Sequence, residues 1–158
     1  MTPAELQSLR WFKYDVYDYA GRVIDWATYS YRTMWWVNVL RERVGSPCIL
    51  IRGSHGEGKE TAVDFFFPHA PYGLVMMETL RLPDVSFGFY SGRNLHLDTR
   101  AYSEVPARWL AIRQEQEPLL KQAGLGHLMV NRANEWTYLT WTDRTGPAAL
   151  NFIANLAA

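Results

Sequence analysis

Residues 85–100 read VSFGFYSGRNLHLDTR, and this stretch decides the fold. Two apolar runs flank a Ser-Gly-Arg link, a pattern that predicts two antiparallel strands joined by a hairpin. In the second run, His96, Asp98 and Arg100 recur at every second position, so their side chains share one face of the sheet. Burial of unpaired charge costs free energy, so this face must be exposed, pair its charges or bind a ligand.

The remaining elements are placed by the spacing of apolar residues and by glycine and proline stop signals. Helices are predicted over residues 3–12, 31–44, 71–82, 106–122 and 147–156, and strands over 48–52, 61–67, 85–90, 94–99 and 136–141. Thr2 and Glu5 form a capping box ahead of the first helix. This order predicts an α+β fold, in which a small antiparallel sheet is flanked by N-terminal and C-terminal helices.

Size and composition limit the classes of protein that fit. The chain has 158 residues and a mass of 18.3 kDa, which fits a single domain over 1–158. Lysine plus arginine and aspartate plus glutamate are 16 each, and the net charge of zero argues against a nucleic-acid partner. There is no apolar leader and no run long enough for a membrane span, so we expect a chain that is cytoplasmic as synthesised.

A second group of polar residues occupies 52–64, in and beside a glycine-rich loop. A mononuclear zinc site needs about three protein ligands and leaves a position open for water. His55 from this loop and Asp64 from the strand that follows it, together with His96, would supply two imidazoles and one carboxylate. The four histidines of the chain could equally all be structural, so the spacing leaves both interpretations open.

Several short motifs resemble those of a known family. They are Ser54-His55, Gly58, Ala62-Val63-Asp64, Gly88-Phe89-Tyr90 and His96-Leu97-Asp98-Thr99-Arg100. Together they are similar to the motifs of the M15 zinc peptidases, which include D-Ala-D-Ala carboxypeptidases and L-Ala-D-Glu endopeptidases, some of them phage endolysins. The resemblance covers about residues 33–100 and leaves residues 1–30 and 101–158 unassigned.

The resemblance implies one zinc ion per chain, held by His55, Asp64 and His96. Arg52, near the end of the preceding strand, would bind the substrate or stabilise the oxyanion with its planar fork of donors. Asp98 would accept a proton from the attacking water. Asp98 could instead form a structural ion pair with an arginine two residues further along the chain.

Two departures from the family pattern leave alternatives open. Asp64 lies nine residues after His55, whereas the family usually has seven, and a gap-free alignment would make Glu57 the first ligand. Some members carry an acid or a histidine three residues before the last ligand, and here that position is Arg93, which cannot act as a base. Glu57 or Glu60 could then be the base, or the base could be absent.

The function implied by the resemblance is cleavage of peptide bonds in bacterial cell-wall peptidoglycan, as a carboxypeptidase or an endolysin-like endopeptidase. A second hypothesis is a non-enzymatic phage virion or assembly protein on the same scaffold, with a structural or lost metal site. If the chain is phage-encoded, we expect it in the virion or released on lysis. Its aromatic flanks are candidates for a protein partner, for self-association or for a wall-peptide groove.

Overall fold

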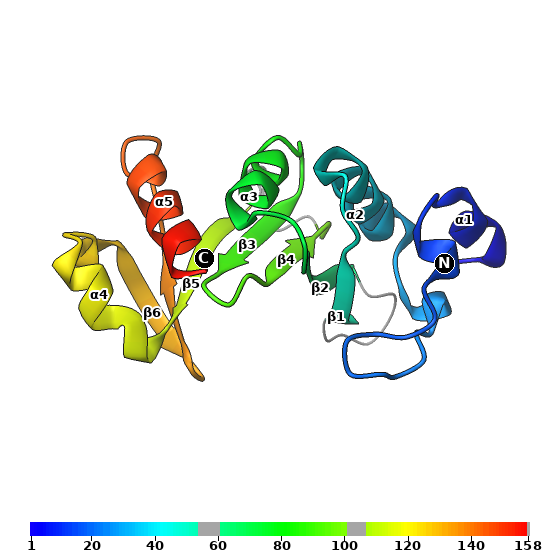
Figure 1. Ribbon diagram of the computed structural model, residues 1–158, viewed down its shortest axis with the longest axis horizontal. Coiled ribbons are helices and arrows are strands. Elements are labelled where there is room, and N and C mark those ends of the chain that lie inside the picture. Colours follow the sequence, from blue (N-terminus) through cyan, green and yellow to red (C-terminus); the bar gives the residue numbers. More distant parts are fainter. Residues whose placement is uncertain (54–60, 101–106, 158) are drawn as a thin grey trace.

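The computed structural model describes residues 1–53, 61–100 and 107–157. The fold is α+β and is built on a seven-stranded mixed sheet in the order β1-β2-β4-β3-β5-β7-β6 (Figure 1). The strands are β1 (Ile49–Gly53), β2 (Ala62–Phe66), β3 (Ser86–Tyr90), β4 (Leu95–Asp98), β5 (Arg108–Arg113), β6 (Met129–Ala133) and β7 (Trp136–Leu139). The α-helices are α1 (Pro3–Ser8), α2 (Tyr31–Val44), α3 (Tyr72–Leu80), α4 (Glu117–Gln122) and α5 (Gly146–Leu156), and the 3-10 helices are η1 (Phe12–Tyr14), η2 (Trp26–Thr28), η3 (Gln114–Gln116) and η4 (Gly126–Leu128).

The main local signals of the N-terminal half are confirmed, although the first helix, predicted over 3–12, ends at Ser8 and a separate 3-10 helix, η1, follows. In the capping box, the Glu5 amide donates a hydrogen bond to the Thr2 hydroxyl, and the Thr2 amide donates to the Glu5 carboxylate at 2.7 Å. Helix α2 has the predicted bounds and ends at Gly45, whose φ of 68° is the left-handed conformation that glycine adopts without strain. The hairpin is also confirmed, with β3 and β4 antiparallel and Arg93 at a φ of 69° in its turn.

The C-terminal half differs from the prediction. The helix predicted over 106–122 is wrong, because residues 108–113 form β5 and the chain becomes helical only from η3 onward. Strand β6 was not predicted, and β5 runs parallel to β3, so the sheet is larger than expected and mixed. The consecutive apolar residues at 109–112 fit the period of a helix as well as that of a strand. In the fold, Leu110 and Ile112 are buried on the sheet, which favours the strand.

The two faces of the sheet have different roles. Helices α2, α3 and α5 lie along one face (Figure 1). The inward-facing residues of the central strands on that side are almost fully buried, and they are Val63, Phe65, Phe87, Phe89, Leu95, Leu97, Leu110 and Ile112. Strand residues alternate between faces, so the residues between these point to the other face, which none of α2, α3 and α5 covers (Figure 1) and which we call the open face. Its polar residues form the candidate site.

Two further properties of the described part of the chain bear on its chemistry. Cys48 is buried, and desolvation raises the pKa of its thiol to about 12. Among the described residues, no helix combines the length and apolar character that a membrane span requires.

Candidate functional site

A row of cross-strand partners runs across five neighbouring strands of the sheet, from β1 to β5. In the pairing register, Arg52 of β1 lies opposite Asp64 of β2, which lies opposite His96 of β4. His96 lies opposite Gly88 of β3, which is paired with Trp109 of β5. The hairpin 85–100 thus provides the centre of this row. The register thus aligns residues that span 57 positions of the sequence in one row, in which Asp64 and His96 are direct neighbours.

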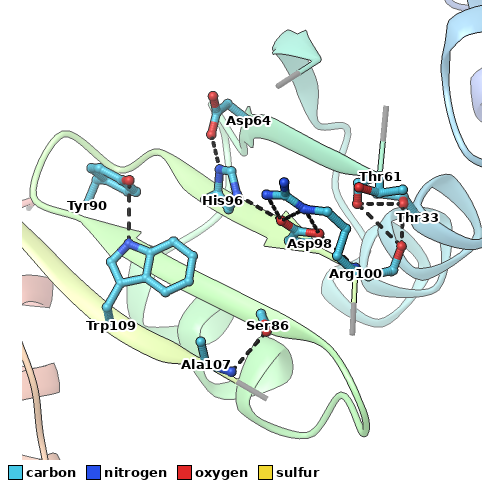
Figure 2. A network of polar contacts seen from close by, with 11 residues as sticks. Thr33, Thr61, Asp64, Ser86, Tyr90, His96, Asp98, Arg100, Ala107 and Trp109 are labelled. Carbon is cyan, nitrogen blue, oxygen red and sulfur yellow. Dashed lines mark hydrogen bonds and ion pairs between the residues drawn. The ribbon is translucent and has the colours of Figure 1, made fainter. Parts of the chain in front are cut away.

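The Asp64 and His96 side chains form a close pair. His96 Nδ1 lies 2.7 Å from Asp64 Oδ1, and the two side chains are 16% and 21% exposed (Figure 2). Two ligands of a tetrahedral zinc ion lie roughly 3.3 Å apart, because each is about 2.0–2.1 Å from the metal. A side-chain rotation that moves Asp64 Oδ1 or His96 Nδ1 by about half an ångström would reach that spacing. The pair therefore fits two ligands of a zinc site, one nitrogen and one oxygen.

Asp98 lies behind His96 and has no exposed surface. Its carboxylate accepts from Arg100 Nε at 2.9 Å and Nη2 at 2.6 Å, and from the Arg100 amide at 2.8 Å. His96 Nε2 lies 4.0 Å from Asp98 Oδ2, so the imidazole stands between two carboxylates (Figure 2). The predicted ion pair of Asp98 with Arg100 is therefore present.

The two carboxylates determine the charge on His96. Burial lowers the pKa of the imidazole, but the hydrogen bond to Asp64 and the nearby Asp98 carboxylate, with the charges of both, outweigh burial and raise the pKa to about 9. In the metal-free protein, His96 is therefore a protonated imidazolium at neutral pH. A metal that binds at Nδ1 has to displace this proton.

Trp109 covers one side of the histidine. The two ring centroids lie 5.3 Å apart at an interplanar angle of 49°. The indole lies directly over Gly88, where a Cβ atom would overlap the ring, so only glycine fits in β3 at this position. The indole Nε1 donates to the Tyr90 hydroxyl at 3.5 Å (Figure 2). Gly88 thus leaves the space that lets Trp109 pack against His96.

A hollow of about 650 Å³ opens on the sheet next to Asp64. Besides Asp64, its walls include Tyr90, Arg113, Trp136 and Tyr138. A second hollow of about 530 Å³ is lined by Trp109 and also by Tyr138. The Asp64–His96 pair therefore lies beside space that an extended ligand could occupy.

The predicted site residues have different outcomes. Asp64, His96 and Asp98 lie together, whereas His55, Glu57 and Glu60 lie outside the described residues. Arg52 is placed by its backbone register opposite Asp64, and its side chain is also outside the described part. Within residues 1–53, 61–100 and 107–157, no group of three His, Cys, Asp or Glu side chains could hold a metal ion. The zinc site with His55 as third ligand thus stays a prediction.

Arg93 and Trp109 are placed in ways that the sequence did not indicate. The guanidinium of Arg93 donates to the carbonyl oxygen of Ala70 at 2.7 Å, and so contributes to the fold rather than to the row. Trp109 belongs to the region without resemblance, yet it contacts the predicted ligand His96. Glycine inside a strand marks a close approach by another group, so Gly88 was the available signal for a large neighbour.

Comparison of the chain with protein-family models, with curated proteins and with solved structures finds no match. Its function is therefore argued from the sequence motifs, the Asp64–His96 pair and the adjacent hollow.

Proposed function

We propose that this protein is a zinc-dependent peptidase that cleaves peptide bonds of bacterial cell-wall peptidoglycan. The observation that carries the proposal is the 2.7 Å contact between Asp64 and His96 at the edge of the 650 Å³ hollow. These two residues were selected as metal ligands from the sequence, 32 positions apart, and they are direct neighbours in the fold. The motifs that resemble M15 peptidases add the class of substrate.

Under this proposal His55, Asp64 and His96 hold the metal. A zinc ion, when bound, supplies Lewis acidity that polarises a carbonyl and lowers the pKa of water. Asp98 holds the Nε2 side of the imidazole and so orients Nδ1 toward Asp64, as carboxylates behind metal-binding histidines do. Arg52, in register with Asp64, would hold the substrate carboxylate or the oxyanion.

The proton acceptor is assigned to the loop rather than to Asp98. A carboxylate with no exposed surface, held on both oxygens by Arg100, is poorly placed to take a proton from water. The remaining candidates from the sequence are Glu57 and Glu60.

The same observations favour one alternative, a non-enzymatic virion or assembly protein on this scaffold. Arg93 occupies the position where some M15 members carry an acid or a histidine, and its side chain is used in a fold contact. Asp98, which is buried and paired with Arg100, fits a structural role. If the loop carries no base, the metal site would be structural or lost.

Digestion of purified peptidoglycan tests the proposal. The wild-type chain with one equivalent of zinc should release new amino groups, and mass spectrometry of the products identifies the bond. EDTA should stop the release, and zinc should restore it. His96→Ala should be inactive, whereas His127→Ala, which changes an exposed histidine of η4, should retain full activity.

Two other outcomes would contradict the proposal. Protein that binds one zinc ion without releasing amino groups would support a structural metal site. Folded protein that binds no zinc would support the scaffold with a lost site.

A further inference from the structure

The wall of the 650 Å³ hollow includes an arginine whose guanidinium lies over an aromatic ring. The guanidinium of Arg113 lies 4.2 Å from the centroid of the Trp136 ring, a cation–π contact. Arg113 and Trp136 are direct cross-strand partners between β5 and β7. The ring of Tyr90 packs edge-on against Trp136 at 4.9 Å. The indole of Trp136 thus contacts both Tyr90 and the guanidinium of Arg113.

The backbone holds this arrangement in place without help from the charge of Arg113. The amide of Gln114 donates to the carbonyl oxygen of Glu135 at 3.1 Å, and the Gln114 side chain donates to the carbonyl oxygen of Asn134 at 2.8 Å. These bonds join the end of β5 to the turn between β6 and β7. Arg113 therefore keeps its place on the wall of the hollow when its ionic partner changes.

The ionic partner of Arg113 is Glu135, and the pair is at the surface. The two side chains are 40% and 63% exposed. Exposed pairs of this kind contribute little to stability, because water screens the charges and two long side chains lose rotamer freedom. A ligand anion that enters the hollow could therefore take the place of Glu135 at small cost.

We propose that Arg113, supported by Trp136, anchors a carboxylate of the peptide substrate, and that Glu135 competes for the same guanidinium. The inference rests on the proposed function, since Asp64 lines the same hollow as Arg113 and a peptide with its scissile bond at Asp64 would extend toward this wall. The planar fork of arginine matches a carboxylate through two parallel hydrogen bonds. Arg22 also lines the hollow, but it is paired with Asp18 at 2.7 Å, whereas the partner of Arg113 is the exposed Glu135.

Binding of short peptides to the full-length chain in EDTA tests the proposal, because no metal-dependent cleavage can consume the probe. One probe is a peptide that ends in D-Ala-D-Ala, and its control is the same peptide with a C-terminal carboxamide in place of the carboxylate. A second pair of probes carries D-Glu with its side chain as acid or as amide. NMR titration gives Kd for each and shows which carboxylate, terminal or side-chain, Arg113 recognises.

We expect Arg113→Gln to weaken binding of the recognised acid roughly tenfold and to leave the matching amide unchanged. Arg113→Lys, which keeps the charge without the planar fork, should give an intermediate loss. Glu135→Gln should tighten binding several-fold. The controls are Arg81→Gln and Glu78→Gln, which remove the charges of an ion pair at the C-terminal end of α3, where Arg81 is 61% and Glu78 12% exposed, and neither residue lines the hollow.

Three results would overturn the anchoring role. They are equal binding by wild type and Arg113→Gln, equal binding of acid and amide in both pairs, and no binding of any probe. Failure of the proposed peptidase has a separate signature, namely zinc-free or inactive protein in the peptidoglycan assay. Peptide binding that depends on Arg113 in an inactive protein would keep the anchor and remove the reaction.

Discussion

The His96 cluster (Asp64, His96, Asp98 and Arg100) and the Glu117 cluster (Glu117, Arg132 and Thr137) use the same ion-pair chemistry in different settings. In the second, Arg132 holds Glu117 with Nε at 2.6 Å and Nη2 at 2.5 Å, and the Thr137 hydroxyl donates to the same carboxylate. These bonds join α4 to the β6–β7 hairpin. Asp98 is held by Arg100 in the same two-pronged way, but there the network continues through an imidazole to Asp64 and the hollow.

The difference shows which feature separates a candidate site from a structural bridge. Hydrogen bonds from Arg132 and Thr137 lower the pKa of Glu117 to about 2, so its charge does not change near neutral pH. The pKa of His96, at about 9, leaves its ring protonated at neutral pH, and Nδ1 faces a second potential ligand at a hollow. An arginine–carboxylate bridge alone is thus compatible with a purely structural role. The titratable ring beside open space points to binding.

Loss of metal binding is the largest effect that we expect. His96→Ala should weaken zinc binding at least about 1000-fold, because it removes a ligand of the site. Glu117→Gln should bind zinc like the wild type, since its cluster contributes no ligand. Competition titration with a chelator of known affinity measures both. If His96→Ala still bound one zinc ion per chain with wild-type affinity, His96 would not be a ligand, and the two clusters would not differ in metal binding.

The dependence of stability on pH should have opposite sign in the two clusters of the metal-free protein. His96 has a folded-state pKa of about 9, above its ordinary value of 6.5, so its contribution is complete below pH 6.5 and is lost as pH rises toward 9. The expected loss is about 3 kcal/mol. Urea unfolding in EDTA at several pH values measures it, and His96→Gln should remove the decline.

The Glu117 contribution should decline in the other direction. Its folded-state pKa of about 2 lies below the ordinary value of 4.5, so this contribution is complete above pH 4.5 and is lost as pH falls toward 2. Glu117→Gln should accordingly lower Tm at pH 7 and make no difference near pH 2. A decline of the His96 contribution below pH 6, or of the Glu117 contribution above pH 7, would contradict the assigned partners.

Asp98→Asn distinguishes two possible roles of Asp98, which are to orient His96 and to accept a proton from water. As a carboxylate behind a metal-binding imidazole, Asp98 should raise zinc affinity about 10–100-fold, and the variant should lose that factor. Glu117→Gln is the matched control, since it neutralises another arginine-bound carboxylate. An Asp98→Asn protein with unchanged zinc affinity and no peptide hydrolysis would instead make Asp98 the proton acceptor.

The sequence predicted the centre of the molecule better than its C-terminal half. The hairpin and α2 carry clear signals, namely alternation around a glycine link and apolar spacing closed by Gly45. The pairing of Asp64 with His96 was also within reach, because a family resemblance and strand alternation point to the same face. Strand β5 was missed because the apolar run at 109–112 has no single period, and its place beside β3 depends on tertiary contacts.

The missed strand had a direct consequence for the site. Without β5, the indole of Trp109 could not be placed beside His96, and Arg113 could not be placed in the hollow. Both residues lie outside the stretch that resembles M15 peptidases. The aromatic residues of that unassigned region were expected to contribute to a groove, an interface or a partner site. Trp109, Trp136 and Tyr138 line the two hollows of the open face.

Gly88→Ala tests whether the indole matters to the site. An alanine Cβ would overlap Trp109, so the ring must move away from His96, and we expect a loss of at least about 1 kcal/mol in unfolding free energy with up to tenfold weaker zinc binding. Gly73→Ala in α3 is the control, because a Cβ there meets no atom within 4 Å, and it should be neutral or slightly stabilising.

A double-mutant cycle with Trp109→Ala then assigns the cause of the Gly88→Ala effect. If overlap with the indole is the cause, Gly88→Ala should cost little once the indole is absent, so the two changes should be strongly non-additive. Equal costs of Gly88→Ala with and without Trp109 would place the strain in β3 itself. Trp109 would then pack against His96 without affecting how the ring is held, and the His96 cluster would be defined by its two carboxylates alone.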